Sequence, residues 1–583
     1  MNTATRKMPI GIQSFEDIRR GEYIYVDKTA LMYQLVTRGK PYFLSRPRRF
    51  GKSLLISTLE AYFLGKKELF KGLAIEQLEQ DWITYPVLHL DLNARKYEKA
   101  EDLIAMLNQH LEIWETTYGY EKQDRSPEER FAGIIRRANE QTGRQVVVLI
   151  DEYDKPLLQV FSNEALLANY RATLKAFYGV LKSADPYLKF VFLTGVTKFA
   201  HVSIFSDLNQ LKDISMFPDY ASLCGITLEE LKQNFRPEIE AVAGENEYTY
   251  EQTLDRLAQK YDGYHFRENT PGMFNPFSLL NALDSRKLDN FWFQTGTPTF
   301  LVELLKKSEF DMRQLIDGIE TEASAFTEYR LEANNPVPLI YQSGYLTIKG
   351  YNREFELYKL QFPNEEVRYG FLSFIAPFYS SITDSDKGFY IGKFVRELRA
   401  GDVDAFLTRL RAFFADFPYE LNARTERHYQ VVFYLVFKLM GQFCDAEVRS
   451  ARAVPMQWSR RKTTSTSSSS SSMVPLTKHW RRSTAKATSS PIPPTNGNWS
   501  KSVYLLMPAN GTSGNGRLLD YNTITICFGC FSISSEILID FELTFFMVLT
   551  GSDDNRENEV PSSSPKACNL IIENRKHRQS DKA

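Results

Sequence analysis

One short stretch, residues 42–56, limits most strongly what this chain can fold into. Its sequence, YFLSRPRRFGKSLLI, reads as an apolar strand, a basic loop and the start of a helix. In phosphate-binding loops built in this order, backbone N–H groups and a helix N-terminus surround phosphate oxygens, a Lys reaches the β- and γ-phosphates, and a Ser ligates Mg²⁺. Gly51-Lys52-Ser53 supplies the second half of the pattern G-x-x-x-x-G-K-S, whereas Arg46 stands where its first glycine belongs.

A second motif lies further along the chain, where the apolar run VVVLI ends in Asp151 and Glu152. Such a run is typical of a buried parallel strand whose carboxyl end enters a site. We expect Asp151 to hold Mg²⁺ through water and Glu152 to polarise the attacking water. Either motif alone is often an ordinary helix start or strand end, but the ordered pair predicts a nucleotide site.

Strand and helix patterns alternate around these motifs. The expected strands are 86–92, 145–151 and 189–195, and the expected helices are 27–39, 53–64, 100–117, 127–141 and 165–182, with a capping box at 227–230. This order predicts an α/β fold, a parallel sheet with helices on both faces. Ligands of such sheets bind where strands end, which is where Lys52, Asp151 and Thr194 fall. Thr194 or Thr197 is the expected sensor of the γ-phosphate.

The composition bears on the compartment and the classes of partner rather than on the activity. The chain of 583 residues has a net charge of -1, so nothing global indicates nucleic acid or a membrane. Its five cysteines are too scattered for a disulfide framework, which suits a reducing compartment. The N-terminus lacks the apolar core of a signal peptide, and we find no uninterrupted apolar run of membrane-spanning length. We therefore expect a cytoplasmic protein without a membrane partner.

The N-terminal segments PIGIQSFEDIRRGEYIYVDKTALMYQL and YFLSRPRRFGKSLLISTLEAYFLGKKELFKGLAI together resemble the bacterial AAA-ATPase-like family. Its members carry R-P-R-R-F-G-K-S in place of the full Walker A glycine pattern, so Arg46 is a family variant. The resemblance covers about the first 230 residues and implies ATP and Mg²⁺ as cofactors. It places Ser53 and Asp151 at the metal and Glu152 and Thr194 in catalysis. The expected nucleotide-binding residues are Arg46, Arg48, Arg49, Phe50, Gly51, Lys52 and Ser53. For the three arginines, the alternatives are that one replaces the missing glycine by charge, that one serves a neighbouring subunit, or that they form a solvated face that steers the anion in.

We expect a P-loop domain over 1–235, a helical lid and linker region over 236–360, part of a nuclease-like domain over 361–452, and an anomalous tail over 453–583. In the third part, helical patterns over 389–398, 403–414 and 425–441 precede the expected start of a strand at 445–448. This order resembles the opening of a PD-(D/E)XK-type nuclease, a fold in which carboxylates bind a divalent metal and a Lys helps to activate water. Glu426 is the one helix carboxylate that we nominate there, and a solvated helix-face charge is its simpler interpretation.

From Val448 to Leu519 the chain contains no Asp or Glu, and it includes a Ser/Thr run and a Pro-rich segment. A basic disordered linker would have such a composition. The genetic code offers another interpretation, because restoring one G near Arg452 lets residues 453–471 be read in the neighbouring frame as GRADAVVETKDYIYVFEFK. This frame supplies the Asp and E-x-K that the nuclease resemblance lacks. We hypothesise that a one-nucleotide deletion removed them from the protein as written.

These observations favour an ATP-binding protein that hydrolyses ATP to move or gate a partner, with nucleic acid and a homo-oligomer both left open. One alternative is an ATP-regulated, metal-dependent DNA nuclease whose active site is lost in this copy. Another is a nucleotide-sensing scaffold that binds ATP without turnover because Arg46 distorts the loop.

Overall fold

The computed structural model describes residues 6–122, 125–198, 210–294, 314–315, 318–327, 335–379, 392–397, 400, 402, 405–406, 408–409, 458–459, 501–508 and 521–528. The chain divides into two compact units, one formed by Met1–Ile391 with Ala412–Leu439 and the other by Gly392–Arg411 with Met440–Ala583. Glu426 and the helix expected around it lie outside the described residues.

The centre of the first unit is a five-stranded sheet in the order β2-β3-β4-β1-β5. Its strands are β1 (Pro41–Ser45), β2 (Val87–Asp91), β3 (Val146–Asp151), β4 (Leu188–Gly195) and β5 (Lys212–Asp213). Every neighbouring pair is parallel. Each residue of β3 is buried, as its continuous apolar run predicts. The expected α/β class with a parallel sheet is confirmed.

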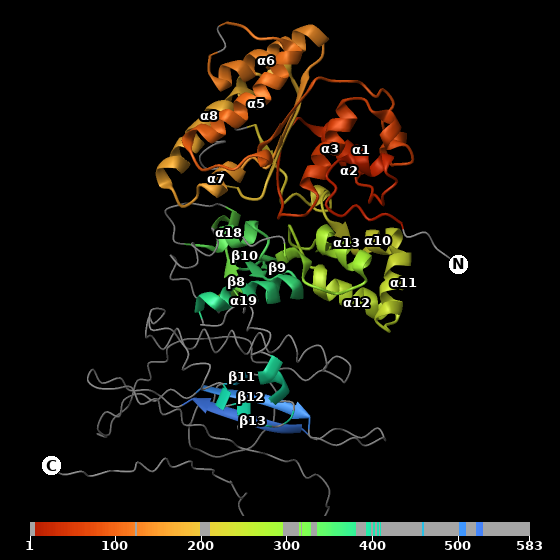
Figure 1. Cartoon of the computed structure of the whole chain (residues 1–583), viewed down its shortest axis with the longest axis vertical. Helices are drawn as coiled ribbons and strands as arrows, with labels where there is room; N and C mark the ends of the chain where they lie inside the picture. The colour runs from red at the N-terminus through yellow and green to blue at the C-terminus, as the bar shows by residue number, and fades with distance from the viewer. Residues whose placement is uncertain are drawn as a thin grey trace, which may run out of the picture. The chain divides into compact units, whose positions relative to one another are not determined.

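Helices cover both faces of this sheet (Figure 1). The first group contains α1 (Phe15–Arg20), α2 (Thr29–Arg38), α3 (Lys52–Phe63) and α4 (Ile75–Leu78), and the second contains α5 (Ala100–Tyr118), α6 (Pro127–Thr142), α7 (Lys155–Gln159) and α8 (Glu164–Ser183). Short 3₁₀ turns are η1 (Lys67–Phe70), η2 (Leu92–Ala94), η3 (Asp185–Tyr187) and η4 (Pro218–Tyr220).

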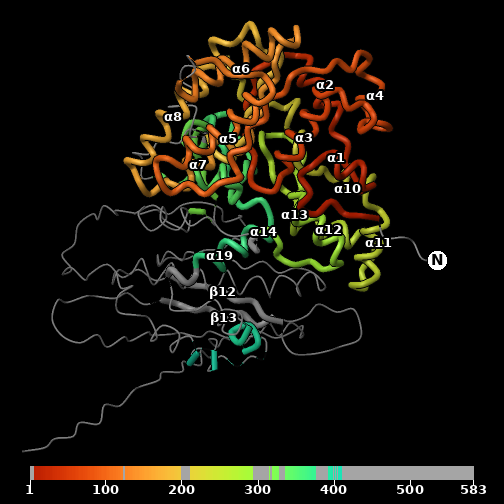
Figure 2. Tube along the Cα trace, turned by 45° about the horizontal axis from the view of Figure 1, so that its top comes forward, coloured from red at the N-terminus to blue at the C-terminus, as the bar shows by residue number. Residues whose placement is uncertain are grey.

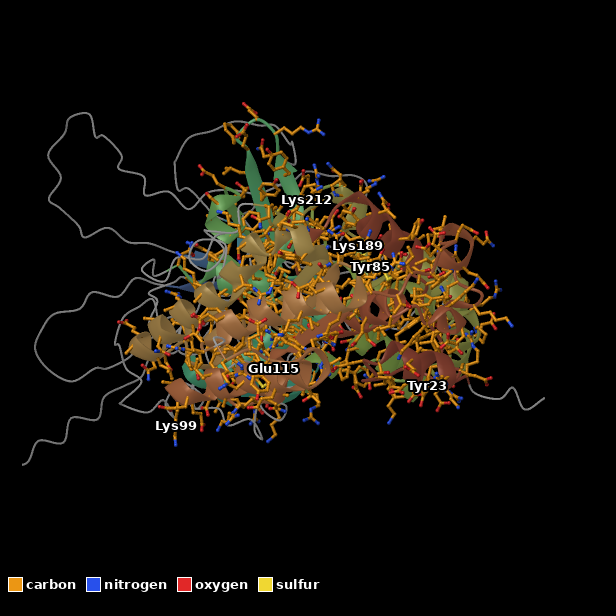
Figure 3. The ribbon with its side chains drawn as sticks, turned by 90° about the horizontal axis from the view of Figure 1, so that it is seen from above. Tyr23, Tyr85, Lys99, Glu115, Lys189 and Lys212 are labelled. Carbon is orange, nitrogen blue, oxygen red and sulfur yellow. The ribbon has the colours of Figure 1, made fainter. Side chains whose placement is uncertain are left out.

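The second group of helices packs through aromatic and ionic contacts. Phe131 of α6 stacks on Phe177 of α8 with ring centroids 4.5 Å apart. Glu115 of α5, labelled in Figure 3, accepts hydrogen bonds of 2.8 and 2.7 Å from Arg130 of α6. A capping box at Ser126 begins α6, and a left-handed glycine at 143 follows its end, so the helix is bounded by local sequence signals.

A helical region follows the sheet. It contains α10 (Leu228–Asn234), α11 (Arg236–Glu245), α12 (Tyr250–Tyr261), α13 (Pro276–Ser285) and α14 (Phe291–Gln294), with a small pairing of β6 (Ile226–Thr227) and β7 (Met273–Phe274). The capping box expected at Thr227 is present. These helices enclose their own apolar cluster, which includes Leu231, Ile239 and Leu257.

An antiparallel sheet in the order β8-β10-β9 lies beyond the helical region. Its strands are β8 (Ile319–Thr321), β9 (Thr347–Asn352) and β10 (Leu357–Gln361), accompanied by α17 (Ser324–Thr327), α18 (Val337–Gln342) and α19 (Glu365–Tyr379). Helix α19 contacts α12 and α14, and Figure 2 shows it beside α14. The expectation of a largely helical region missed this sheet, because β8 has only three residues and β9 contains a glycine, Gly350, which weakens its strand pattern.

Within the segment expected to be an anomalous tail, the structure describes the backbone of β11 (Trp458–Ser459), β12 (Lys501–Pro508) and β13 (Tyr521–Phe528), paired in that order. Among the residues described in the whole chain, no helix is both long and apolar enough to cross a membrane.

Candidate nucleotide-binding site

The carboxyl edge of the parallel sheet gathers the ends of β1, β3 and β4. After β1 the chain forms a loop and enters α3 at Gly51, whose φ of 88° is left-handed. A side chain at this position would meet no atom within 4 Å, so the backbone there faces open space. Arg49 is also left-handed, with φ of 67°. The loop therefore presents α3's N-terminus to an accessible position, the arrangement that favours an anion.

Lys52 begins α3 and is 4% exposed. Its Nζ donates hydrogen bonds to the carbonyl oxygens of Arg46 and Pro47, at 3.1 and 3.2 Å. A carboxylate oxygen of Glu152 lies 3.9 Å from the same nitrogen. The lysine of the first motif, at the start of α3, therefore lies close to the glutamate of the second motif, which follows β3.

Asp151 ends β3 and is held by two donors. Its Oδ1 accepts a hydrogen bond of 2.6 Å from the Thr194 hydroxyl and one of 3.0 Å from the Glu152 backbone N–H. Within the described part of the chain, Oδ2 accepts no hydrogen bond. Thr194 is fully buried at the end of β4, so its hydroxyl fixes the orientation of the Asp151 carboxylate.

Glu152 has a left-handed backbone, with φ of 53°, and its side chain is 22% exposed. Burial raises the pKa of this carboxyl, while the positive charge of Lys52 lowers it. A carboxylate with a raised pKa beside a buried ammonium has the chemistry of a general base.

Arg46 lies in a cage of protein groups. It is 1% exposed, and its guanidinium donates to the carbonyl oxygens of Ser45, Ser215 and Tyr220 at 2.9, 2.8 and 3.1 Å. The guanidinium carbon lies 4.0 Å from the ring centroid of Phe266. Burial lowers the pKa of Arg46 to about 10. Carbonyl oxygens and a ring face therefore surround this cation in place of a carboxylate.

The remaining expected loop residues are arranged differently. Arg48 and Arg49 are exposed, and Arg49 lies 4.9 Å over the ring of Phe277 in α13. Phe50 is 1% exposed and packs edge-on against Tyr264 at a centroid distance of 4.8 Å. Ser53, in the first turn of α3, is partly exposed. The loop is thus fastened to the helical region by aromatic contacts.

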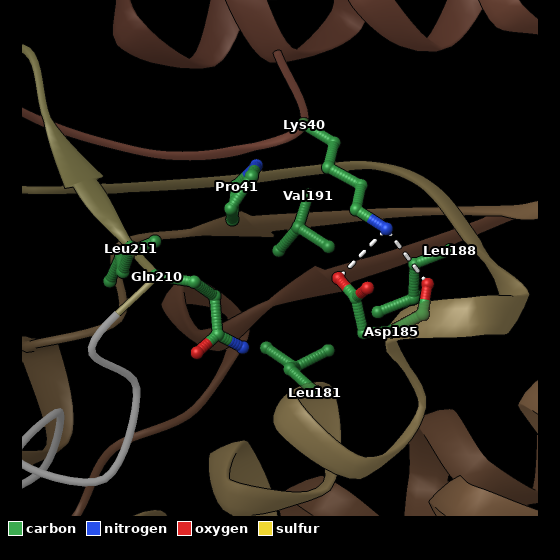
Figure 4. A pocket seen from close by; sticks show the side chains of 8 residues that line it. All are labelled: Lys40, Pro41, Leu181, Asp185, Leu188, Val191, Gln210 and Leu211. Atoms are coloured by element: carbon green, nitrogen blue, oxygen red, sulfur yellow. Dashed lines mark hydrogen bonds and ion pairs between the residues drawn. The ribbon is translucent and has the colours of Figure 1, made fainter.

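A cavity of about 110 Å³ adjoins Gly51. Its lining comes from the N-terminal segment, α3, residues 223–226 and α13, and includes Tyr25, Val26, Leu54, Cys224, Ile226 and Leu280. A cavity needs only about 10–15 Å³ of such space to hold one water, so this one has room for a larger ligand. By contrast, the pocket of Figure 4 lies near the amino ends of β1 and β4 and measures about 10 Å³, and its lining includes the ion pair between Lys40 and Asp185.

Several residues around the site were not predicted from sequence. Asp154 is fully buried and hydrogen-bonds to backbone N–H groups after β4, and the Lys155 side chain donates to Asn93 after β2. In the sequence, Asp154 and Lys155 look like ordinary solvated charges after a strand, so no sequence pattern singles them out. The cavity residues likewise look in sequence like ordinary core residues, because the gap between them is a product of packing.

Three comparisons place these features among known proteins. A family model described as Predicted AAA-ATPase matches residues 9–205. An uncharacterized protein in the vnfD 5′ region of Azotobacter chroococcum mcd 1 is 36% identical over 445 residues, which cover 75% of this chain and 83% of that protein. A structure of the Aeropyrum pernix ORC2 protein (ADPNP-ADP complexes) is 11% identical and covers 59% of this chain and 90% of that chain, with a TM-score of 0.23.

Proposed function

The chain belongs to the predicted AAA-ATPase family, and we propose that it binds ATP at the carboxyl edge of its parallel sheet and hydrolyses the γ-phosphate there. The observation that carries this proposal is the meeting of Lys52 and Glu152, 3.9 Å apart, at the entrance to α3. A buried ammonium that is held mainly by backbone carbonyls can exchange them for phosphate oxygens at small cost.

The cavity beside Gly51 is the proposed site of the adenine base. It opens next to the loop that would hold the phosphates, and its lining is mainly apolar. An apolar slot adjoining a basic loop suits a ligand with a flat ring at one end and negative charge at the other.

The residues present fit Mg²⁺ as well. Within the described residues no group of three or more acidic, His or Cys side chains is placed to hold a metal ion. Mg²⁺ bound beside nucleotides usually takes one or two protein oxygens together with phosphates and waters. Ser53 Oγ and Asp151 Oδ2 are the oxygens that we assign to it. When bound, the ion would neutralise charge on the phosphates.

Glu152 is the proposed base. Its carboxylate would take a proton from the attacking water, while Lys52 would stabilise the charge that develops on the γ-phosphate oxygens. Thr194, the expected γ-phosphate sensor, is fully buried and donates its hydroxyl to Asp151, so the role that we propose for it is to hold that carboxylate. The hydrolysis products would be ADP and phosphate.

Phosphate release by purified protein tests this assignment. We expect Lys52→Ala to abolish tight Mg²⁺-dependent ATP binding, and Glu152→Gln to retain binding but lower turnover by about 10²-fold or more. Lys66→Ala is the matched control, because Lys66 lies beyond the far end of α3 and pairs with Glu16 at 2.6 Å. Unchanged binding and turnover in Lys52→Ala would refute the proposal. Tight binding without turnover, unaffected by Glu152→Gln, would favour the nucleotide-sensing scaffold.

The cavity assignment has its own test at Cys224. Phe in place of Cys224 should fill the slot and weaken ATP binding about tenfold or more, because the base then has no apolar surface to occupy. Ala at the same position leaves the slot open and should bind ATP like the wild type. Fluorescence titration with an ATP analogue measures the dissociation constant of each variant. Equal affinity of the two variants would show that the adenine base binds elsewhere.

The nuclease alternative and the nucleic-acid and homo-oligomer partners stay predictions of the resemblance. The carboxylate nominated for the nuclease, Glu426, lies outside the described residues.

A further inference from the structure

A second carboxylate close to Glu152 has no part in the chemistry proposed so far. Asp154 is fully buried, and its Oδ2 accepts hydrogen bonds from Val196 N, Thr197 N and the Thr197 hydroxyl at 3.1, 2.6 and 2.6 Å. The second oxygen, Oδ1, also accepts from Val196 N, at 3.2 Å. A buried carboxylate is costly unless donors surround it, and here the donors all belong to Val196 and Thr197, directly after β4.

Tyr153 fastens the same two segments. Its backbone N–H donates to the carbonyl of Thr194 at 3.0 Å, and its hydroxyl donates to the carbonyl of Thr197 at 2.7 Å. The approach is close enough to require glycine at 195. A Cβ there would lie 2.4 Å from a ring carbon of Tyr153 and 2.7 Å from Asp154 Oδ1. The turn after β3 and the end of β4 are therefore joined as one unit.

Glu152 lies between fixed neighbours in this unit. On one side, Asp151 is hydrogen-bonded to Thr194. On the other, Tyr153 and Asp154 hold residues 194–197. The left-handed backbone of Glu152 is unfavourable for a residue with a side chain and persists only where the surroundings enforce it. The consequence of that backbone is that the Glu152 carboxylate lies beside Lys52.

We propose that Asp154 is a positioning residue, which keeps the Glu152 carboxylate facing Lys52 by fastening the turn after β3 to the end of β4. The inference rests on the proposed function, in which Glu152 is the base for ATP hydrolysis. Asp154 contacts neither the nucleotide nor the attacking water; it acts through the backbone that carries Glu152.

The test is Asp154→Asn in the full-length protein, measured as kcat, KM and ATP affinity. An amide of the same shape puts an N–H group against donors, so the fastening loosens while the pocket keeps its volume. We expect kcat to fall about 10²-fold, as for a base displaced by about an ångström, with ATP affinity within about threefold of the wild type. In a Glu152→Gln background the same change should have no further effect on kcat, because Asp154 acts through Glu152.

Two further variants keep the inference falsifiable. Tyr153→Phe removes the single hydrogen bond to the Thr197 carbonyl and should lower kcat less, in the same background-dependent way. Asp185→Asn is the matched control, because Asp185 precedes β4 at the opposite edge and its ion pair with Lys40 is remote from the site. If Asp154→Asn does not fold, Tyr153→Phe decides.

The outcomes separate the two levels of the argument. Turnover that depends on Lys52 and Glu152 but is unchanged in Asp154→Asn would show that the positioning role is wrong, while the proposed function stands. If Asp154→Asn does not fold, unchanged turnover in Tyr153→Phe leads to the same conclusion. If Asp154→Asn lowers kcat equally in the wild-type and Glu152→Gln backgrounds, the positioning role is also overturned, because a general loss of structure would not depend on Glu152. If the wild type shows no turnover that depends on Lys52 and Glu152, the proposed function and the positioning role fail together.

Discussion

At position 46 an arginine stands where phosphate loops most often have glycine, and its side chain explains how the fold accommodates it. The guanidinium is turned into a cage formed by the carbonyls of Ser45, Ser215 and Tyr220. Arg46 thereby joins the end of β1 to the segment after β5, while its own carbonyl accepts from Lys52. We infer that Arg46 fixes the loop conformation through these protein contacts rather than by binding phosphate.

This role predicts that restoring glycine harms the protein. Arg46→Gly leaves buried carbonyls without donors and should lower the free energy of unfolding by about 2–4 kcal/mol. Arg49→Gly is the comparison, because Arg49 is exposed and already left-handed, so glycine there should change stability by less than about 1 kcal/mol. Urea titration of both variants measures the difference. Equal stability of Arg46→Gly and the wild type would contradict the cage.

The sequence allowed the type and order of the charged residues at this site to be predicted, but not the direction of each side chain. Lys52, Asp151 and Thr194 were expected at one edge of the sheet, and the structure places all three there. Nothing in RPRRFGKS distinguishes the buried Arg46 from the exposed Arg48. Asp154 was missed for the same reason, since its donors are backbone N–H groups of a distant segment.

Among the elements, helices with strong caps were predicted closely and short strands were not. Helix α6 was expected over 127–141 and spans Pro127–Thr142, because Ser126 and Gly143 mark its ends. The sheet of β8, β9 and β10 was missed, since short strands leave too few alternating residues to show a period. Its neighbour α19 carries a buried acid, Glu366, which accepts a hydrogen bond of 2.8 Å from the Trp292 backbone N–H.

The buried Glu366 should make the free energy of unfolding depend on pH. Burial raises its pKa from 4.5 to about 7, against the lowering effect of the Trp292 N–H. Because the folded-state pKa is above the unfolded one, the folded protein keeps a proton that the unfolded chain releases. Stability should therefore fall as pH rises from about 4.5 to 7, by roughly 3 kcal/mol in total.

Glu366→Gln separates this effect from packing. The amide oxygen can still accept from Trp292, and the group no longer ionises, so the variant should unfold at a higher temperature than the wild type at pH 8. Thermal unfolding of both proteins from pH 5 to pH 8 measures the effect. A wild type and variant with parallel pH dependence would show that Glu366 does not titrate in this range.

At the scale of the whole molecule, the frameshift hypothesis concerns the segment after Arg452. The hypothesis of a one-nucleotide deletion predicts that an independent clone carries one additional G across the codons for residues 450–457. An identical sequence in that clone would refute the frameshift and leave the tail as written.

The central claim, that ATP is hydrolysed at Lys52 and Glu152, is tested most directly by identifying the nucleotide that each protein retains. Wild type, Glu152→Gln and Lys52→Ala would be incubated with ATP and Mg²⁺, desalted rapidly and denatured, and the released nucleotide separated by chromatography. We predict ADP from the wild type, intact ATP from Glu152→Gln and neither from Lys52→Ala. Intact ATP from the wild type, or equal retention by Lys52→Ala, would contradict the claim.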